Sequence, residues 1–311
     1  MSRLVVRHVT RYAYGAPAAF SQHLMRLTPQ DGASQRVLAA DLRISPKPDE
    51  ADRFTDAFGN ACAAATVASP HKVLEIEATA LVERLRAPDL MQAASTPWED
   101  VAAAARTPAG LPAAPFAFPT RFTAADDALE AWARRSFPAG RPVLEAAREL
   151  CARIHAHFDY APGVTGAETT GLDAFRGARG VCQDFSHAML AACRAVGAPA
   201  AYISGYLRTY PPEGQARLVG ADATHAWVAV WDPAVGWTEF DPTNDMEPGL
   251  DHIALARGRD YGDCSPVTGL VVGSGGQTLT VSVDVAPADA AAQGRSQAQA
   301  QAQAQASPGA T

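Results

Sequence analysis

A cysteine, a histidine and an aspartate in the second half of the 311-residue chain could together carry out nucleophilic catalysis. Cys182 follows a glycine-bearing turn, and the apolar residues after it recur at helical spacing, so it stands at the expected first turn of a helix. The unpaired N–H groups and the dipole at a helix N-terminus favour a thiolate over a thiol. Arg176 and Arg179 act in the same direction. Cys182 therefore occupies a position suited to a nucleophile.

A nucleophilic thiol needs a base, and the base needs an acceptor that orients it. His225 opens an alternating run that predicts a strand, residues 232–236 predict a turn, and Asp241 closes the run that follows. Because the midpoint between positions 225 and 241 falls inside the turn, the two residues should lie nearly opposite each other on an antiparallel hairpin. His225 could then present one ring nitrogen to Cys182 and the other to Asp241. The backbone N–H of Cys182 is a candidate oxyanion donor.

Each member of this triad also has a purely structural explanation. A cysteine in an Ala-rich helix is commonly a small buried hydrophobe. A histidine beside tryptophans can be a packed strand residue, and an aspartate before proline can simply form a turn. Three complementary roles at compatible positions nevertheless favour catalysis over these explanations.

Other combinations of side chains are weaker. His187 is a rival base, but it comes five residues after Cys182 and therefore lies roughly 140° around the helix. Asp222 and Asp245 are weaker candidates for the orienting acid. A metal site built from Cys182, His187 and His225 matches no recognised ligand spacing, so we expect no metal.

Composition argues against several functional classes. The net charge of −7 disfavours a nucleic-acid or anionic-membrane partner, and no apolar run is long enough to span a bilayer. The first residues alternate and carry charge, unlike a signal peptide, so a cytoplasmic location is expected. The five cysteines are scattered without a Cys-x-x-Cys pair, which argues against disulfides and structural zinc. No cofactor is expected, because side chains suffice for the proposed chemistry.

Sequence patterning divides the chain into four segments. Residues 1–86 alternate between apolar and polar and predict a β domain. Residues 87–123 are rich in Pro and Ala and predict a surface connector, with one helical turn near Trp98. Residues 124–286 contain the helical signals, the proposed triad and a closing β segment, and are predicted to be the catalytic core. Residues 287–311 form an Ala/Gln-rich tail that we expect to be disordered.

Several motifs carry a resemblance to a known family. Around the proposed triad stand Gly-Val-Cys-Gln-Asp-Phe at 180–185, Ser-Gly-Tyr at 204–206, Asp-Ala-Thr-His-Ala-Trp-Val at 222–228 and Asp-Pro-Thr-Asn at 241–244. With these motifs the sequence resembles the bacterial transglutaminase-like superfamily, which is often described as a group of cysteine proteases. Residues 11–14 and 23–29 resemble the N-terminal β domain of a bacterial subgroup, and residues 258–266 resemble its closing segment.

The resemblance implies an α+β fold with a papain-like core, in which the helix bearing the cysteine packs on an antiparallel sheet. It also implies an N-terminal β domain, and Cys182, His225 and Asp241 as the catalytic triad. Superfamily members include transglutaminases, peptidases, amidases and deglycosylating enzymes, and some lack the triad, so the fold does not select the reaction. Calcium, on which some relatives depend, would need an acidic loop that this sequence does not show.

We therefore predict a cysteine-dependent amide hydrolase, a peptidase or amidase that acts on a peptide or protein amide through a thioester. Water is the expected acceptor, because no site for an acceptor amine is evident. The alternatives are a protein-glutamine transglutaminase and a non-catalytic binding module, which an inaccessible Cys182 thiol would favour. From proximity and resemblance, Tyr206, Trp227 and Asp260 are predicted to line the substrate cleft. The sequence indicates neither an oligomeric state nor a partner protein.

Overall fold

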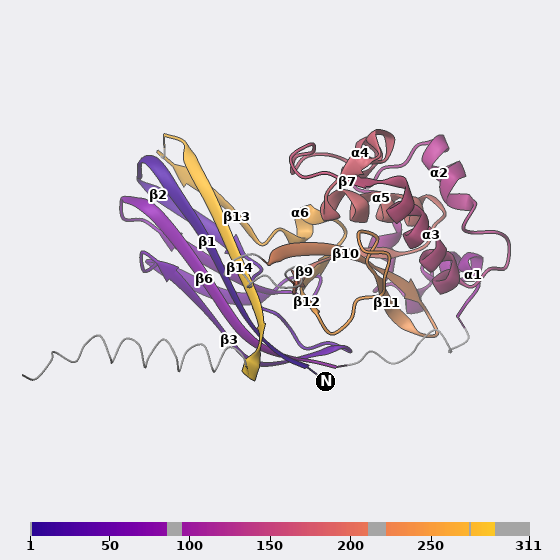
Figure 1. Cartoon of the computed structure of the whole chain (residues 1–311), viewed down its shortest axis with the longest axis horizontal. Helices are drawn as coiled ribbons and strands as arrows, with labels where there is room; N and C mark the ends of the chain where they lie inside the picture. Colours follow the sequence, from indigo (N-terminus) through magenta and orange to yellow (C-terminus); the bar gives the residue numbers. More distant parts are fainter. Residues whose placement is uncertain (1, 86–94, 211–221, 274, 290–311) are drawn as a thin grey trace, which may run out of the picture.

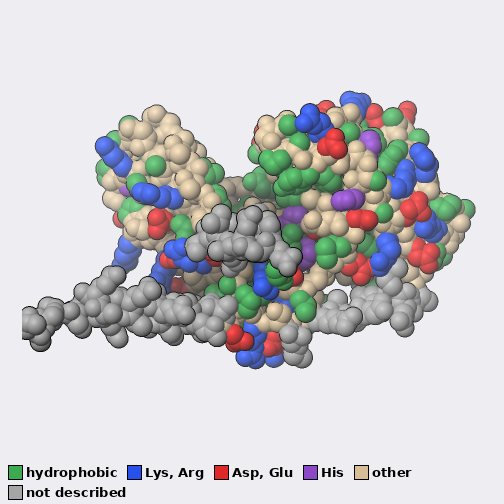
Figure 2. Space-filling model, in the orientation of Figure 1, with side chains coloured by type: hydrophobic (Ala, Val, Ile, Leu, Met, Phe, Trp, Pro, Cys, Tyr) green, Lys and Arg blue, Asp and Glu red, His purple; other side chains and the backbone are tan. Residues whose placement is uncertain are grey.

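The computed structural model describes residues 2–85, 95–210, 222–273 and 275–289. They form two lobes, one of β-strands alone and one in which helices pack on a sheet (Figure 1). The surface is hollowed between the lobes (Figure 2). The predicted disordered tail lies outside the described residues from position 290 onward. None of the described helices is both long and apolar enough to cross a membrane.

The β lobe consists of two antiparallel four-stranded sheets, in the orders β14-β1-β6-β3 and β13-β2-β5-β4. The alternation predicted for the strand around residues 74–82 is confirmed, because its apolar side chains point inward and are buried. The strands are β1 (Ser2–Ala18), β2 (Phe20–Met25), β3 (Gln35–Ser45), β4 (Glu50–Thr55), β5 (Ala61–Val67), β6 (His71–Arg84), β13 (Val267–Val272) and β14 (Gln277–Pro287).

The last two strands return to the β lobe from the far end of the chain. β13 pairs with β2 and β14 pairs with β1, so the closing β segment completes both N-terminal sheets. The sequence-based division grouped this segment with the catalytic core. The strand pattern itself was correctly read, but pairing between residues more than 250 positions apart leaves no mark in local periodicity.

In the second lobe, helices cover one face of an antiparallel sheet with the order β11-β10-β9-β12. The described part of the predicted connector, residues 95–123, contains one short helix, α1, and two 3-10 turns. The helices are α1 (Trp98–Ala104), α2 (Asp127–Arg134), α3 (Val143–His157), α4 (Gly171–Gly177), α5 (Cys182–Ala195) and α6 (Tyr261–Cys264), and the strands are β7 (Asp159–Tyr160), β8 (Arg179–Gly180), β9 (Ala200–Leu207), β10 (Ala223–Asp232), β11 (Gly236–Phe240) and β12 (His252–Gly258).

Helix α5 is the centre of this lobe. Its apolar side chains, such as Phe185 and Met189, join a core with α2, α3 and β10, and nearly all its residues are buried. Helix α4 approaches it so closely that a Cβ at Gly171 would lie 2.5 Å from the carbonyl carbon of His187. A residue larger than glycine would therefore push the two helices apart. The core thus fixes the position of α5 and of the cysteine at its start.

The two lobes meet along β12, which is an edge strand of the sheet β11-β10-β9-β12. The side-chain amide of Gln35 donates to the carbonyl of Ala254 and accepts from its N–H, both at 2.9 Å. The amide of Asn60 forms the same pair of bonds with the backbone of Arg257, at 2.8 and 2.7 Å. These side chains replace the strand partner that the edge lacks. The β lobe therefore holds β12 in register.

Candidate active site

The first turn of α5 is organised by a buried carboxylate. Oδ2 of Asp184 accepts the backbone N–H of Val181 at 2.8 Å and the hydroxyl of Thr165 at 2.7 Å. Asp184 is 1% exposed, and burial raises its pKa although these bonds lower it. A Cβ at Gly180 would lie 2.5 Å from the same carboxylate, so only glycine fits before the turn. This packing sets the position of Cys182, whose side chain is half-buried.

His225 and Asp241 come together as predicted, although their register differs from the prediction. The hairpin pairs Val228 with Phe240 and Asp232 with Gly236, so Asp241 lies diagonal to His225 rather than opposite. The side chains still meet, with Nε2 of His225 2.7 Å from Oδ2 of Asp241. The turn is centred one residue later than the sequence suggested, and the diagonal neighbours still come within hydrogen-bond distance.

The ring of His225 is 8% exposed. Burial alone would lower its pKa, but hydrogen bonds to Asp241 and Cys182, together with their charges, raise the pKa to about 9. Since Nε2 is engaged by Asp241, Nδ1 is the ring nitrogen left for the thiol. The structure thus brings Cys182, His225 and Asp241 together, with the histidine between the other two.

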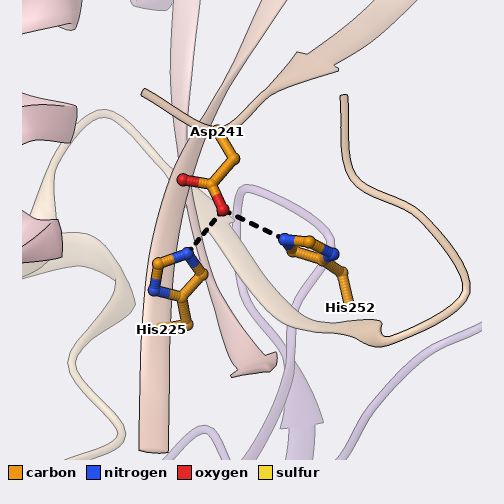
Figure 3. A group of neighbouring side chains, drawn as sticks. All are labelled: His225, Asp241 and His252. Atoms are coloured by element: carbon orange, nitrogen blue, oxygen red, sulfur yellow. Dashed lines mark hydrogen bonds and ion pairs between the residues drawn. The ribbon is translucent and has the colours of Figure 1, made fainter. Parts of the chain in front are cut away.

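Asp241 is fully buried and accepts five hydrogen bonds (Figure 3 shows two of them). Oδ1 accepts the backbone N–H groups of Thr243 and Asn244, at 3.0 and 3.2 Å. Oδ2 accepts from His225, from the side-chain amide of Asn244 at 2.7 Å and from Nε2 of His252 at 3.1 Å. Burial would raise the pKa of Asp241, but these bonds outweigh it and hold the pKa well below its usual range.

His252 is a residue that the sequence reading missed. It begins β12, which lies on the other side of β9 from β10, so nothing in the local pattern connects it with His225. Gly205 in β9 makes room between them, because a Cβ there would lie 2.4 Å from the Trp227 ring. That ring packs edge-on against His252, with centroids 5.4 Å apart. The glycine of the Ser-Gly-Tyr motif was the one available signal.

His225, Asp241 and His252 also place three potential metal ligands within 4.8 Å of one another. Their hydrogen bonds argue against a metal centre. The N–H of Gly249 donates to Nδ1 of His252 at 3.3 Å, so the proton of this ring is on Nε2, where a metal would bind. A metal-ligating histidine instead donates from its second nitrogen. The amide of Asn244 also points a donor at Oδ2 of Asp241.

The rival base His187 lies apart from this group. It is fully buried, its ring stacks on Phe122, and its Nε2 accepts the N–H of Tyr261 at 3.1 Å. Burial, reinforced by the charge of Arg194, lowers its pKa to about 3. Asp222, the weaker candidate acid, instead accepts hydrogen bonds from Thr209 and Val285. Neither residue joins the His225–Asp241 pair.

The three predicted substrate-binding residues are all buried, which differs from the prediction. Tyr206 is 1% exposed and contacts His8 of the β lobe through a 2.9 Å hydrogen bond. Trp227 is 0% exposed, and its indole N–H donates to Glu239. Asp260 is 6% exposed and caps α6. Trp227 lies beside His225, with ring centroids 6.0 Å apart, but none of the three side chains is exposed enough to line a cleft.

An exposed aromatic side chain near the thiol was not predicted. Tyr160 in β7 is 58% exposed, and its pKa is raised by burial of the hydroxyl and by the charge of Cys182. β7 runs parallel to β8, directly before the cysteine-bearing helix. Tyr160 is therefore placed to contact a substrate that reaches Cys182. Its signal in the sequence is weak, because a two-residue strand has no periodicity.

A cavity of about 560 Å³ lies elsewhere, where the β lobe faces β11 and β12. Its lining includes Phe58, Trp237 and Arg257 but no member of the proposed triad. The group formed by Cys182, His225 and Asp241 therefore lies outside this cavity.

Comparison with known proteins shows the family of this chain. Residues 4–83 match the bacterial transglutaminase-like N-terminal region, and residues 130–242 match the transglutaminase-like superfamily. An uncharacterised protein of Mycobacterium tuberculosis is 37% identical over 279 residues, which cover 86% of this chain and 87% of that protein. The chain belongs to the transglutaminase-like superfamily. The resemblance read from the sequence motifs is thereby confirmed.

Two further relatives of the superfamily are informative. A candidate cysteine protease from Cytophaga hutchinsonii shares the fold over 92% of this chain and 91% of its own, with a TM-score of 0.68 at 21% identity. A protein-glutamine gamma-glutamyltransferase of Pseudomonas aeruginosa is 35% identical over 124 residues, which cover 37% of this chain and 18% of that enzyme. The predicted fold, an α+β transglutaminase-like core behind an N-terminal β domain, is confirmed.

Proposed function

We propose that this protein is a cysteine-dependent amide hydrolase in which Cys182, His225 and Asp241 are the catalytic residues. One observation carries the proposal: a buried histidine lies between a partly buried cysteine and a buried carboxylate, and its pKa is raised to about 9. A histidine that remains protonated at neutral pH is suited to pair with a thiolate. The family relationship supports enzymatic chemistry of this general kind.

In the first half-reaction the thiolate of Cys182 attacks the carbonyl carbon of a peptide or protein amide. The developing oxyanion is held by the N–H of Cys182 at the start of α5. The C–N bond breaks as His225 gives its Nδ1 proton to the leaving amine. The products are a free amine and a thioester on Cys182.

In the second half-reaction neutral His225 removes a proton from water, and the resulting hydroxide attacks the thioester. The C–S bond breaks, the carboxylic acid leaves and the thiolate–imidazolium pair is restored. Asp241 keeps the ring in one orientation throughout and compensates the imidazolium charge, as the acid of a triad does. No step requires a metal or a cofactor.

A second candidate is transfer of the acyl group to an amine, as in a protein-glutamine transglutaminase. The 124-residue similarity to the Pseudomonas aeruginosa enzyme favours it. The first half-reaction is unchanged, and a primary amine replaces water in the second. Incubating the protein with a casein digest and a fluorescent primary amine separates the two: fluorescent peptides indicate transfer, whereas new carboxylates alone indicate hydrolysis.

The nucleophile itself is tested without a substrate. We would measure the iodoacetamide alkylation rate of each cysteine by mass spectrometry from pH 5 to 10, in the wild type and in His225→Ala. We expect Cys182 to react at least about 10-fold faster than any other cysteine at pH 7, and to lose this advantage in the variant. Buried Cys151, whose pKa is raised by burial, is the internal control. Equal rates for Cys182 in both proteins would favour the binding-module alternative.

A further inference from the structure

We propose that His252 is a positioning residue that fixes the carboxylate of Asp241 for His225. The site would then consist of four hydrogen-bonded residues instead of three. This inference rests on the proposed function, because it assigns a role within the same site. His252 touches neither the thiol nor a substrate. It acts through Asp241, which it meets on the oxygen that also serves His225 (Figure 3).

The first argument is the convergence of donors on one atom. Nε2 of His225 and Nε2 of His252 both lie within hydrogen-bond distance of Oδ2, at 2.7 and 3.1 Å. His252 is 1% exposed and Asp241 is 0% exposed, so water does not compete for these bonds. A buried carboxylate with fixed donors on both oxygens cannot rotate to follow a moving partner. It therefore stays aligned while His225 gains and loses its proton.

The second argument is the proton on His252. Because Nδ1 accepts the backbone N–H of Gly249 at 3.3 Å, the ring proton is on Nε2, the nitrogen that faces Asp241. Its Nε2–H is therefore a constant donor to Asp241. His225 differs, because Asp241 occupies its Nε2 and Cys182 is its other hydrogen-bonding neighbour, which leaves Nδ1 to exchange a proton. The two rings share one acceptor but only one of them can act as an acid and base.

The third argument is the way in which His252 is itself held. It begins β12, whose outer edge is paired by the amide side chains of Gln35 and Asn60 from the β lobe. Its ring lies edge-on against Trp227, and the indole N–H of Trp227 is fixed by Glu239 at 2.9 Å. The β lobe thus contributes to the catalytic group through the position of β12.

The direction in which His252 changes the pKa of His225 follows from the sharing of one Asp241 oxygen among several donors. Three donors divide the negative charge of Oδ2, namely His225, His252 and the amide of Asn244. If the His252 donor is removed, more of that charge acts on His225 and its imidazolium is stabilised further. The pKa of His225 should therefore rise above about 9. A merely structural role for His252 would change the stability of the protein and leave this pKa where it is.

Two amide substitutions form a matched pair for the test. In His252→Gln the side-chain amide reaches the place of Nε2 and can donate to Asp241. In His252→Asn it stops near the place of Nδ1, where it can accept from Gly249 but cannot reach Asp241. Both replace an aromatic ring by an amide, so they lose the same packing against Trp227. His8→Asn is a control for the loss of a buried, hydrogen-bonded histidine outside the site.

The titration of His225 is followed by NMR of the histidine side chains, and the Cys182 alkylation rate is measured over the same pH range. We expect the Asn variant to raise the His225 midpoint by roughly 0.5 to 1 pH unit, and the Gln variant to stay close to the wild type. The alkaline side of the pH–rate profile for Cys182 alkylation should shift in the same direction as the His225 midpoint. His8→Asn should leave both unchanged, whatever it does to thermal stability.

The outcomes separate this inference from the proposed function. If Cys182 is reactive and depends on His225, but the Asn and Gln variants give the same His225 midpoint, then His252 is only a packing residue and the inference fails alone. If Cys182 of the wild type is no more reactive than the other cysteines, the proposed function fails first. A Gln variant shifted as far as the Asn variant would also count against positioning, because the donor would be irrelevant.

Discussion

Two buried histidines of the lobe that contains α5, His225 and His187, have opposite acid–base character. Both are at least nine-tenths buried, and burial disfavours the charged form of each. The pKa of His187 falls to about 3, whereas that of His225 rises to about 9. The two rings therefore differ in their partners and not in their exposure.

The partners explain the difference. His187 stacks between Phe122 and Tyr202, accepts one backbone N–H and lies near the positive charge of Arg194. His225 has a carboxylate on Nε2 and a thiol as its second neighbour. A histidine on the cysteine-bearing helix is thus a structural element, while a histidine on the adjacent sheet has the surroundings of a general base.

The largest expected effect comes from making the surroundings of His225 resemble those of His187. Asp241→Asn removes the charge and keeps the size of the side chain. The pKa of His225 should then fall below 6.5, since burial is no longer opposed by a carboxylate. We expect the alkylation rate of Cys182 at pH 7 to drop by about 10²-fold or more, as judged from the loss of a triad acid. His187 should titrate as before, which NMR of the same sample checks.

A fall of less than about threefold in that rate would contradict the assigned role of Asp241, provided that the variant is folded. Circular dichroism and urea unfolding establish the fold. His225→Gln is the companion variant, because it leaves the carboxylate with its donors from Asn244 and His252. The two variants should lower the rate to a similar level, since the pair acts as one unit.

Much of the difference between the two histidines could be predicted from the sequence. What could not be predicted has a physical reason. Periodicity placed Cys182 at a helix start and His225 and Asp241 on one hairpin, because these signals are local. The angle of roughly 140° between Cys182 and His187 around α5 correctly predicted that His187 points away from the thiol. The predicted centre of the turn was one residue too early in the sequence. The residue types in the turn do not specify which position is its centre.

The rest depends on contacts between distant parts of the chain. His252 reaches Asp241 across β9, and β14 pairs with β1 across nearly the full length of the chain. Local patterns do not encode such pairings. The burial of Tyr206 was equally hidden, because it results from a hydrogen bond to His8 and packing against the β lobe. The exposure of such a residue is therefore set by contacts with distant parts of the chain and not by the local sequence.

A smaller effect is expected when the second histidine is removed. His187→Leu keeps much of the apolar volume against Phe122 but leaves the N–H of Tyr261 without its acceptor. An unsatisfied buried donor costs about 1–3 kcal/mol, so the free energy of unfolding in urea should fall by that amount. The alkylation rate of Cys182 and its pH profile should be unchanged. A shifted pH profile would mean that the two histidines are coupled, contrary to the comparison.

The smallest effect, and the most direct test of the contrast, is the pH dependence of stability. His187 has a lowered pKa in the folded protein, so its contribution is present above pH 6.5 and is lost as the pH falls toward about 3. His225 has a raised pKa, so its contribution is fully present below pH 6.5 and is lost as the pH rises through about 9. Urea unfolding from pH 4 to 10 should therefore show that His187→Leu flattens the acidic side of the stability profile and His225→Gln the basic side. Flattening on the same side by both variants would show that partners do not distinguish the two rings.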